Sequence, residues 1–128
     1  MASARIQVVE DDVDIRTALC AILAEEGYAV SCAANGREAL EMLHAGPAPQ
    51  VILLDLMMPV MAGADFRAAQ LADPSLSTIP VIVLTADARI QETSRALGAA
   101  ASFAKPFELP RLLRAIAGIV AAQRFAAA

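Results

Sequence analysis

The segment Val51-Ile-Leu-Leu-Asp55 decides the fold, because it is a short apolar run that ends in a single carboxylate. Turn residues bound the run, which suits a strand buried on both faces, as in a parallel sheet covered by helices. Val81-Ile-Val-Leu84 has the same character. The sequence therefore predicts two central strands of one parallel sheet.

Strand-like runs and helical periodicity alternate along the rest of the chain. Asp12 and Asn35 are suitable N-caps, the latter paired with Glu38. We expect strands at 6–9, 28–33, 51–54, 81–84 and 101–104, and helices between Asp12 and Gly27, between Asn35 and Gly46, and over 65–72, 87–97 and 108–124. The last helix carries an apolar stripe of Leu109, Leu112, Leu113, Ile116, Ile119 and Val120. Strict alternation argues for a parallel sheet with helices on both faces.

The bulk composition narrows the class of protein. At 128 residues the chain fits one domain, and its hydrophobic fraction of 58% is high largely because of alanine. The net charge of −4 has the wrong sign for a nucleic-acid binder. No apolar run approaches the roughly 20 residues that span a bilayer, and no signal peptide is evident. We expect a cytoplasmic protein that binds neither nucleic acid nor membrane, with Cys20 and Cys32 as unpaired thiols.

Polar side chains stand where the predicted strands end. Glu10-Asp11-Asp12 follows the first strand, Asp55 the third, Thr85 the fourth and Lys105 the fifth. Each has an ordinary explanation alone: Asp12 is a helix cap, and a lone lysine is usually solvated. Ligands of open α/β sheets bind beyond the carboxyl ends of the strands, so we expect these groups to converge at one edge.

Such a cluster favours phosphoryl chemistry. Neighbouring carboxylates repel one another, and a hard divalent cation, Mg²⁺ or Mn²⁺, relieves that repulsion. Lys105 and Thr85 are then donors to anionic oxygens on the far side. Phosphoryl transfer depends mainly on such positioning and charge neutralisation.

In their order and spacing, four stretches resemble the receiver domain of bacterial two-component response regulators: Val8–Asp12, Asp55–Pro59 with Gly63, Val83–Ala86 and Lys105–Phe107. The resemblance covers essentially the whole chain. It implies a CheY-like, flavodoxin-like α/β fold, with a doubly wound (βα)5 sheet of parallel strands in the order 2-1-3-4-5. It also implies a single receiver domain over residues 1–128, with a core at about 4–124 and no output domain.

The resemblance assigns a role to each position of the cluster. The phosphoacceptor would be Asp55. The metal ligands would be Glu10 (directly or through water), Asp11, Asp55 and the backbone carbonyl of Met57. Thr85 and Lys105 would contact the phosphoryl oxygens, and the Lys105–Pro106 peptide is expected to be cis.

The resemblance also implies partners. The phosphoryl group would come from a sensor histidine kinase or a histidine phosphotransfer protein, and the phosphorylated form would bind a downstream protein. The site would catalyse transfer and dephosphorylation on itself, so we expect a signalling protein, a monomer or weak dimer, and not a turnover enzyme. The expected readout face is the fourth helix, fifth strand and fifth helix, with Arg89, Arg95, Arg111 and Arg114.

The chain departs from the receiver pattern at Ser102, where many receivers carry an aromatic residue that swings inward on activation. Phe103 comes one residue later, and a one-residue offset in a strand points a side chain to the opposite face. We expect Phe103 to lie in the core. The Thr85–Asp87 loop and the helix after it would then carry the signal.

Two other functions use the same fold class. A haloacid-dehalogenase-like phosphohydrolase would use Asp55 as nucleophile, but it needs an acid/base Asp where Met57 stands. A nucleotide-binding protein would need a glycine-rich phosphate loop, and neither GxGxxG nor GxxxxGK[ST] is present. A receiver that has lost its chemistry and only binds partners is the third alternative.

Overall fold

The computed structural model, which describes residues 3–58, 60–87 and 89–127, contains a five-stranded parallel sheet of order β2-β1-β3-β4-β5. Strands and helices alternate along the chain: β1 (Arg5–Val9), α1 (Val13–Glu25), β2 (Ala29–Ala33), α2 (Gly36–Ala45), β3 (Val51–Asp55), α3 (Gly63–Ala72), β4 (Val81–Thr85), α4 (Ile90–Leu97), β5 (Ala101–Ala104) and α5 (Leu109–Ala127). The predicted fold class and strand order are confirmed.

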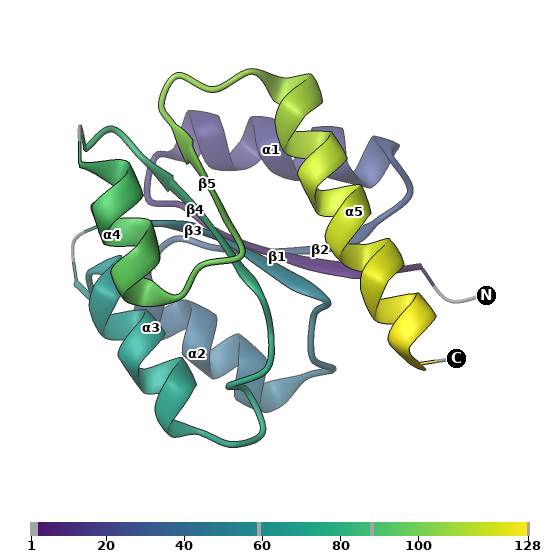
Figure 1. Cartoon of the computed structure of the whole chain (residues 1–128), viewed down its shortest axis with the longest axis horizontal. Helices are drawn as coiled ribbons and strands as arrows, with labels where there is room; N and C mark the ends of the chain where they lie inside the picture. The colour runs from purple at the N-terminus through teal and green to yellow at the C-terminus, as the bar shows by residue number, and fades with distance from the viewer. Residues whose placement is uncertain (1–2, 59, 88, 128) are drawn as a thin grey trace.

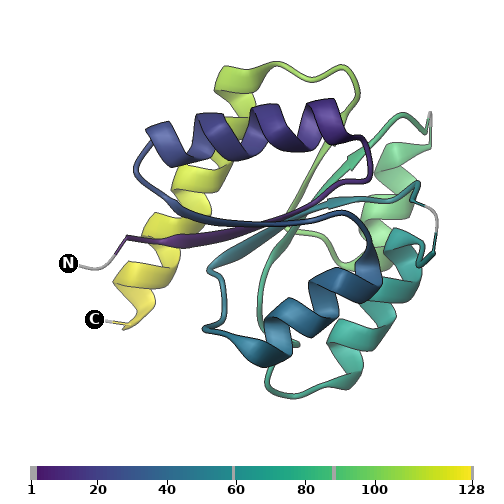
Figure 2. The same ribbon diagram turned by 180° about the vertical axis from the view of Figure 1, so that it is seen from behind.

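Helices cover both faces of the sheet (Figure 1). α1 and α5 lie on one face, and α2, α3 and α4 lie on the other, as the reverse view also shows (Figure 2). Every residue of β3 and of β4 is buried, as expected for central strands sandwiched between two helical layers.

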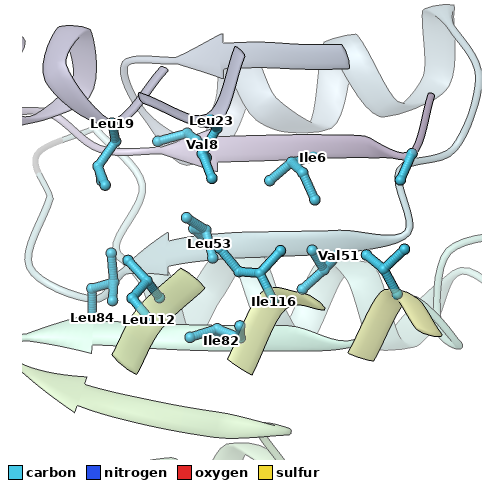
Figure 3. Packing of buried hydrophobic residues seen from close by; sticks show 12 residues of the cluster. Ile6, Val8, Leu19, Leu23, Val51, Leu53, Ile82, Leu84, Leu112 and Ile116 are labelled. Atoms are coloured by element: carbon cyan, nitrogen blue, oxygen red, sulfur yellow. The ribbon is translucent and has the colours of Figure 1, made fainter. Parts of the chain in front are cut away.

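One of two core clusters lies between the sheet and the α1–α5 layer (Figure 3). Ile6 and Val8 of β1 point into it, and Leu19 and Leu23 of α1 cover them. On α5, Leu112, Ile116 and Val120 are buried and the other residues of the predicted stripe are partly buried. Phe103 of β5 packs against this cluster, which confirms that it belongs to the core. Truncating one of these leucines to alanine costs about 2–5 kcal/mol in typical cores.

Side-chain caps set the starts of two helices as predicted. The Asp12 carboxylate accepts from the N–H groups of Asp14 (2.9 Å) and Ile15 (3.1 Å). The Asn35 side chain accepts from the Glu38 N–H at 2.9 Å. Each cap satisfies backbone donors that the first helical turn leaves open.

The expected start of the fourth helix at Asp87 is wrong, because α4 begins at Ile90. The Thr85 hydroxyl accepts from the Asp87 N–H at 3.1 Å, and the Asp87 carboxylate accepts from the Arg89 N–H at 2.8 Å. These side chains hold the backbone in a turn that competes with the helix. Residue 88, which lies in this predicted helix, is outside the described residues.

The expectation of two unpaired thiols is also wrong. Cys20 of α1 and Cys32 of β2 form a disulfide, with their Cα atoms 6.7 Å apart. α1 packs along β2, and this packing brings together two residues that no sequence motif connects. Within the described part of the chain, no helix is both long and apolar enough to cross a membrane.

Candidate functional site

Three carboxylates meet where two neighbouring strands end. Val9 of β1 is in register with Leu54 of β3, so Glu10 and Asp55 follow side by side at the same edge. Oxygen atoms of Glu10, Asp11 and Asp55 all lie within 4.8 Å of one another. Glu10 and Asp55 are only 1% and 3% exposed, whereas Asp11 is exposed.

Lys105 approaches the carboxylates from the loop after β5. Its Nζ donates to Glu10 Oε2 at 2.8 Å and lies 3.4 Å from Asp55 Oδ2. The Lys105 N–H donates to the Thr85 carbonyl at 2.9 Å, which extends the β4–β5 pairing by one residue toward the carboxylates. The Lys105–Pro106 peptide is cis, as predicted.

One ammonium does not balance the negative charge of the cluster. Burial, the neighbouring Asp11 carboxyl and the charge of Glu10 raise the pKa of Asp55 to about 7, although the Met57 N–H and Lys105 act in the opposite direction. Burial alone would lower the pKa of Lys105, but the bond to Glu10 and the charge of Asp55 outweigh it, so that pKa is raised. Without further positive charge, the proton on Asp55 is therefore lost only as the pH rises through about 7.

The donor set fits a hard divalent cation. A hollow of about 190 Å³ opens beside the cluster, and it is lined by Glu10, Asp11, Asp12, Ile15, Asp55, Met57, Ala86 and Lys105. Mg²⁺ takes carboxylate, carbonyl and water oxygens, and several of these surround the hollow. A divalent ion would also add positive charge beside three carboxylates that face a single described ammonium, and it would lower the pKa of Asp55.

Thr85 and Met57 occupy different places relative to this hollow. Thr85 is fully buried, its hydroxyl is engaged by the Asp87 N–H, and it is not part of the described lining. Met57 lines the hollow, and its N–H donates to Asp55 Oδ1 at 3.1 Å. The two oxygens of Asp55 thus have different partners: the Met57 N–H donates to Oδ1, and the Lys105 ammonium lies beside Oδ2.

Gly63 fixes the course of the loop that follows Asp55. Its N–H donates to the Leu56 carbonyl at 3.1 Å. A Cβ added at Gly63 would lie 2.7 Å from Leu56 Cα and 2.8 Å from the Asp55 carbonyl oxygen. Only glycine permits this close approach of two backbone segments. In the same loop Val60 has a φ of 71°, a left-handed conformation that costs free energy for a β-branched residue.

Arg16 is a positioning residue that the sequence reasoning missed. Its Nη1 donates to the carbonyls of Glu10 (2.8 Å) and Asp11 (3.3 Å). The guanidinium thereby holds the backbone that carries two of the three carboxylates. The one hint of this role in the sequence is the position of Arg16 on the first turn of the helix that Asp12 caps, close to Glu10 and Asp11.

The sequence of the chain matches a known family. The sequence profile of the response regulator receiver domain matches residues 6–117. The chain belongs to this family.

Relatives of this receiver agree in sequence and in fold. The response regulator MprA of Mycolicibacterium vanbaalenii is 39% identical over 111 residues, which cover 85% of this chain and 47% of that protein. The chain thus spans about half the length of the curated relatives it matches. The chemotaxis protein CheY4 of Vibrio cholerae has a TM-score of 0.83 at 32% identity, with 92% of this receiver and 99% of CheY4 covered.

A second solved structure contains bound Mg²⁺-BeF. The response regulator TrrA of Thermotoga maritima, in complex with Mg²⁺-BeF, has a TM-score of 0.79 at 28% identity. The match covers 91% of this receiver and 98% of TrrA. The receiver family and the CheY-like fold are therefore established, and the expected absence of an output domain stays a prediction.

Proposed function

We propose that this receiver accepts a phosphoryl group on Asp55 in a reaction that depends on Mg²⁺ or Mn²⁺. The observation that carries the proposal is the meeting of three carboxylates within 4.8 Å with Lys105 Nζ 3.4 Å from Asp55 Oδ2. A buried carboxylate with an ammonium on one side and a metal-type donor set on the other suits phosphoryl transfer. The binding of Mg²⁺-BeF by the related TrrA supports the same chemistry here.

The attacking group is the ionised Asp55 carboxylate. Its pKa of about 7 means that the proton must leave before an oxygen attacks phosphorus. An O–P bond to Asp55 then forms as the P–N bond of a phosphohistidine on the donor breaks, and the electron pair of that bond stays with the imidazole. A bound divalent ion, held by Asp11, Asp55, the Met57 carbonyl and Glu10 directly or through water, would neutralise charge on the phosphoryl oxygens.

Lys105 changes partner during this reaction. Before transfer its shorter contact is to Glu10, at 2.8 Å against 3.4 Å to Asp55. The phosphoryl group on Asp55 adds anionic oxygens beside the ammonium, and these compete with Glu10 for it. We propose that Lys105 then donates to a phosphoryl oxygen.

Thr85 links the site to the start of α4. Its hydroxyl accepts from the Asp87 N–H, two residues into the β4–α4 loop. We propose that the hydroxyl turns to the phosphoryl oxygens after transfer and donates to one of them. The Asp87 N–H then loses its partner, so the loop and the beginning of α4 rearrange.

The proposed donor is a sensor histidine kinase or a histidine phosphotransfer protein, and the proposed output is binding to a downstream protein. Arg89, Arg95, Arg111 and Arg114 are all exposed on the α4–β5–α5 face and suit an acidic partner surface. Because Ser102 stands where an aromatic gate would be, the Thr85–Asp87 loop would carry the signal. We propose a cytoplasmic signalling protein and not a turnover enzyme.

The test is labelling by acetyl phosphate with Mg²⁺, followed by intact mass measurement. We expect wild type to gain one phosphoryl group and Asp55→Ala to gain none, and chelation of the metal to prevent the gain in wild type. An unlabelled wild type, or equal labelling of Asp55→Ala, would contradict the proposal. The first result would favour a receiver that only binds partners.

A further inference from the structure

Arg67 of α3 is a buried guanidinium with an unusual set of partners. The residue is 6% exposed. Its Nε donates to the Leu97 carbonyl at 3.0 Å, and its Nη2 donates to the Gly98 carbonyl at 3.2 Å. Among the described residues no carboxylate forms an ion pair with Arg67. Burial lowers the pKa of this guanidinium, which shows the cost of its desolvation.

The C-terminal end of α4 compensates the buried charge. The last carbonyls of a helix lack partners within the helix and carry about half a negative charge in total. At the end of α4 the Gly98 N–H donates to the carbonyls of Arg95 and Ser94, and the Ala99 N–H donates to the Ser94 carbonyl. Gly98 has the left-handed φ of 65° common at helix ends. Arg67 binds the next two carbonyls along the chain that these N–H groups leave open, those of Leu97 and Gly98, so a side chain of α3 completes the cap of α4.

Gln70 holds the guanidinium in this orientation. It is fully buried, and its Oε1 accepts from Arg67 Nη1 at 2.7 Å. Its Nε2 donates to the carbonyls of Leu76 and Ile79, both at 2.9 Å, in the connection between α3 and β4. Every polar atom of the Gln70 side chain therefore has a partner, and the network joins α3, the α3–β4 connection and the end of α4.

The other end of α4 is held differently: its described side-chain hydrogen bonds come from Thr85 and Asp87, which directly precede it in the chain, and not from another helix. Its N-cap residue, Arg89, makes no side-chain cap hydrogen bond, and Ser94 is the one buried residue of the helix. This end follows the carboxyl end of β4, where Leu84 is in register with Asp55 of β3. α4 is thus tied to α3 at the end remote from the carboxylates, whereas the described side-chain hydrogen bonds at the near end come from Thr85 and Asp87 before the helix.

We propose that Arg67 is a positioning residue that anchors the C-terminal turn of α4, so that rearrangement of α4 on phosphorylation is confined to its N-terminal part. The second half of this inference rests on the proposed phosphorylation of Asp55, and the first half does not. The anchor acts through the guanidinium fork, because a single ammonium cannot bind Leu97, Gly98 and Gln70 with the same geometry.

Residue-resolved amide hydrogen exchange tests the anchor first in unphosphorylated protein. In Arg67→Met the apolar stem stays but the donors are lost, so we expect exchange at Gly98 and Ala99 to accelerate by about tenfold or more. We expect Arg67→Lys to keep part of the protection of Gly98 and Ala99. If Arg67→Met does not fold, Arg67→Lys is compared with wild type in its place. Arg37→Met is the matched control, because it removes one arginine at an exposed position of α2. It should leave the exchange of Gly98 and Ala99 unchanged.

The same measurement with acetyl phosphate and Mg²⁺ tests the confinement. In wild type we expect exchange to change over residues 86–93 and not at 94–99, and in Arg67→Met the change should extend through 94–99. Unaltered protection at Gly98 and Ala99 in unphosphorylated Arg67→Met, or acceleration spread evenly over all helices, overturns the anchor. A change still confined to 86–93 in phosphorylated Arg67→Met overturns the confinement. If wild type gains no phosphoryl mass, the proposed function is contradicted instead. The exchange of unphosphorylated wild type and Arg67→Met still tests whether Arg67 anchors the end of α4.

Discussion

Lys105 Nζ and Asp55 Oδ2 lie 3.4 Å apart although the two residues are 50 positions apart in the sequence. The contact exists because β3, β4 and β5 are consecutive neighbours in a parallel sheet, so their carboxyl ends open onto one edge. The sheet thereby brings an ammonium to a buried carboxylate, and the predictions below follow from this arrangement.

Replacement of Lys105 should impair signalling without unfolding the protein. Lys105→Ala removes the ammonium at the sheet edge but no core side chain, so we expect an unchanged circular dichroism spectrum. The buried Glu10 loses its charged partner, which should lower the free energy of unfolding by about 1–3 kcal/mol without metal. The exchange response of residues 86–93 to acetyl phosphate should be lost. An unfolded variant would show that the lysine is structural, and a full response would show that it does not read the phosphoryl group.

The raised pKa of Asp55 should make metal-free protein less stable as pH rises. The folded state keeps the Asp55 proton up to a pH of about 7, whereas the ordinary value is 3.8. The resulting stability is fully present below the ordinary value and is lost as pH rises through about 7. In urea unfolding with a chelator, we expect wild type to lose more stability than Asp55→Asn between about pH 5 and about pH 8. Parallel pH profiles of the two proteins would contradict the raised pKa.

Gly63→Ala should destabilise the loop that follows Asp55. The added methyl group would meet Leu56 Cα at 2.7 Å and the Asp55 carbonyl oxygen at 2.8 Å, and both are backbone atoms that cannot move independently. We expect a loss of about 1–3 kcal/mol in the free energy of unfolding and slower labelling by acetyl phosphate. Gly118→Ala on α5 is the matched control, because nothing lies within 4 Å of its added Cβ. That variant should gain about 0.5–1 kcal/mol. Equal effects of the two substitutions would refute the steric argument.

The Cys20–Cys32 bridge can be tested by alkylation under denaturing conditions. We expect no alkylated cysteine without reductant and two after reduction, since both sulfurs are in the disulfide. If protein taken directly from cells without reductant has two alkylated cysteines, Cys20 and Cys32 are free thiols there, as the sequence predicted. Disulfides are rare in a reducing cytosol, so this measurement also tests the proposed location.

The sequence predicted the architecture and the carboxylate–lysine cluster, and one rule explains why. The apolar runs ending at Leu54 and Leu84 identify central strands, and residues that follow parallel strands meet at one edge. Asp55, Glu10 and Lys105 therefore come together whatever the details of packing. The receiver resemblance adds their roles, which remain proposals for this chain.

Features that depend on packing between elements were not predictable in the same way. Cys20 and Cys32 lie on two elements whose facing positions are set only when α1 packs on β2. The start of α4 depends on whether the N–H groups of Asp87 and Arg89 donate to the side chains of Thr85 and Asp87 or take part in helix formation. Arg67 has the sequence appearance of an exposed helical arginine, and only the position of the α4 end reveals why it is buried.

The most direct test is to locate the acyl phosphate chemically. Borohydride reduces a phosphorylated aspartate to homoserine, and peptide mass mapping then identifies the residue. After acetyl phosphate and Mg²⁺ we predict homoserine at position 55 alone. Homoserine at Asp11 or Asp12, or none in protein that has gained phosphoryl mass, would contradict the assignment of Asp55 as phosphoacceptor.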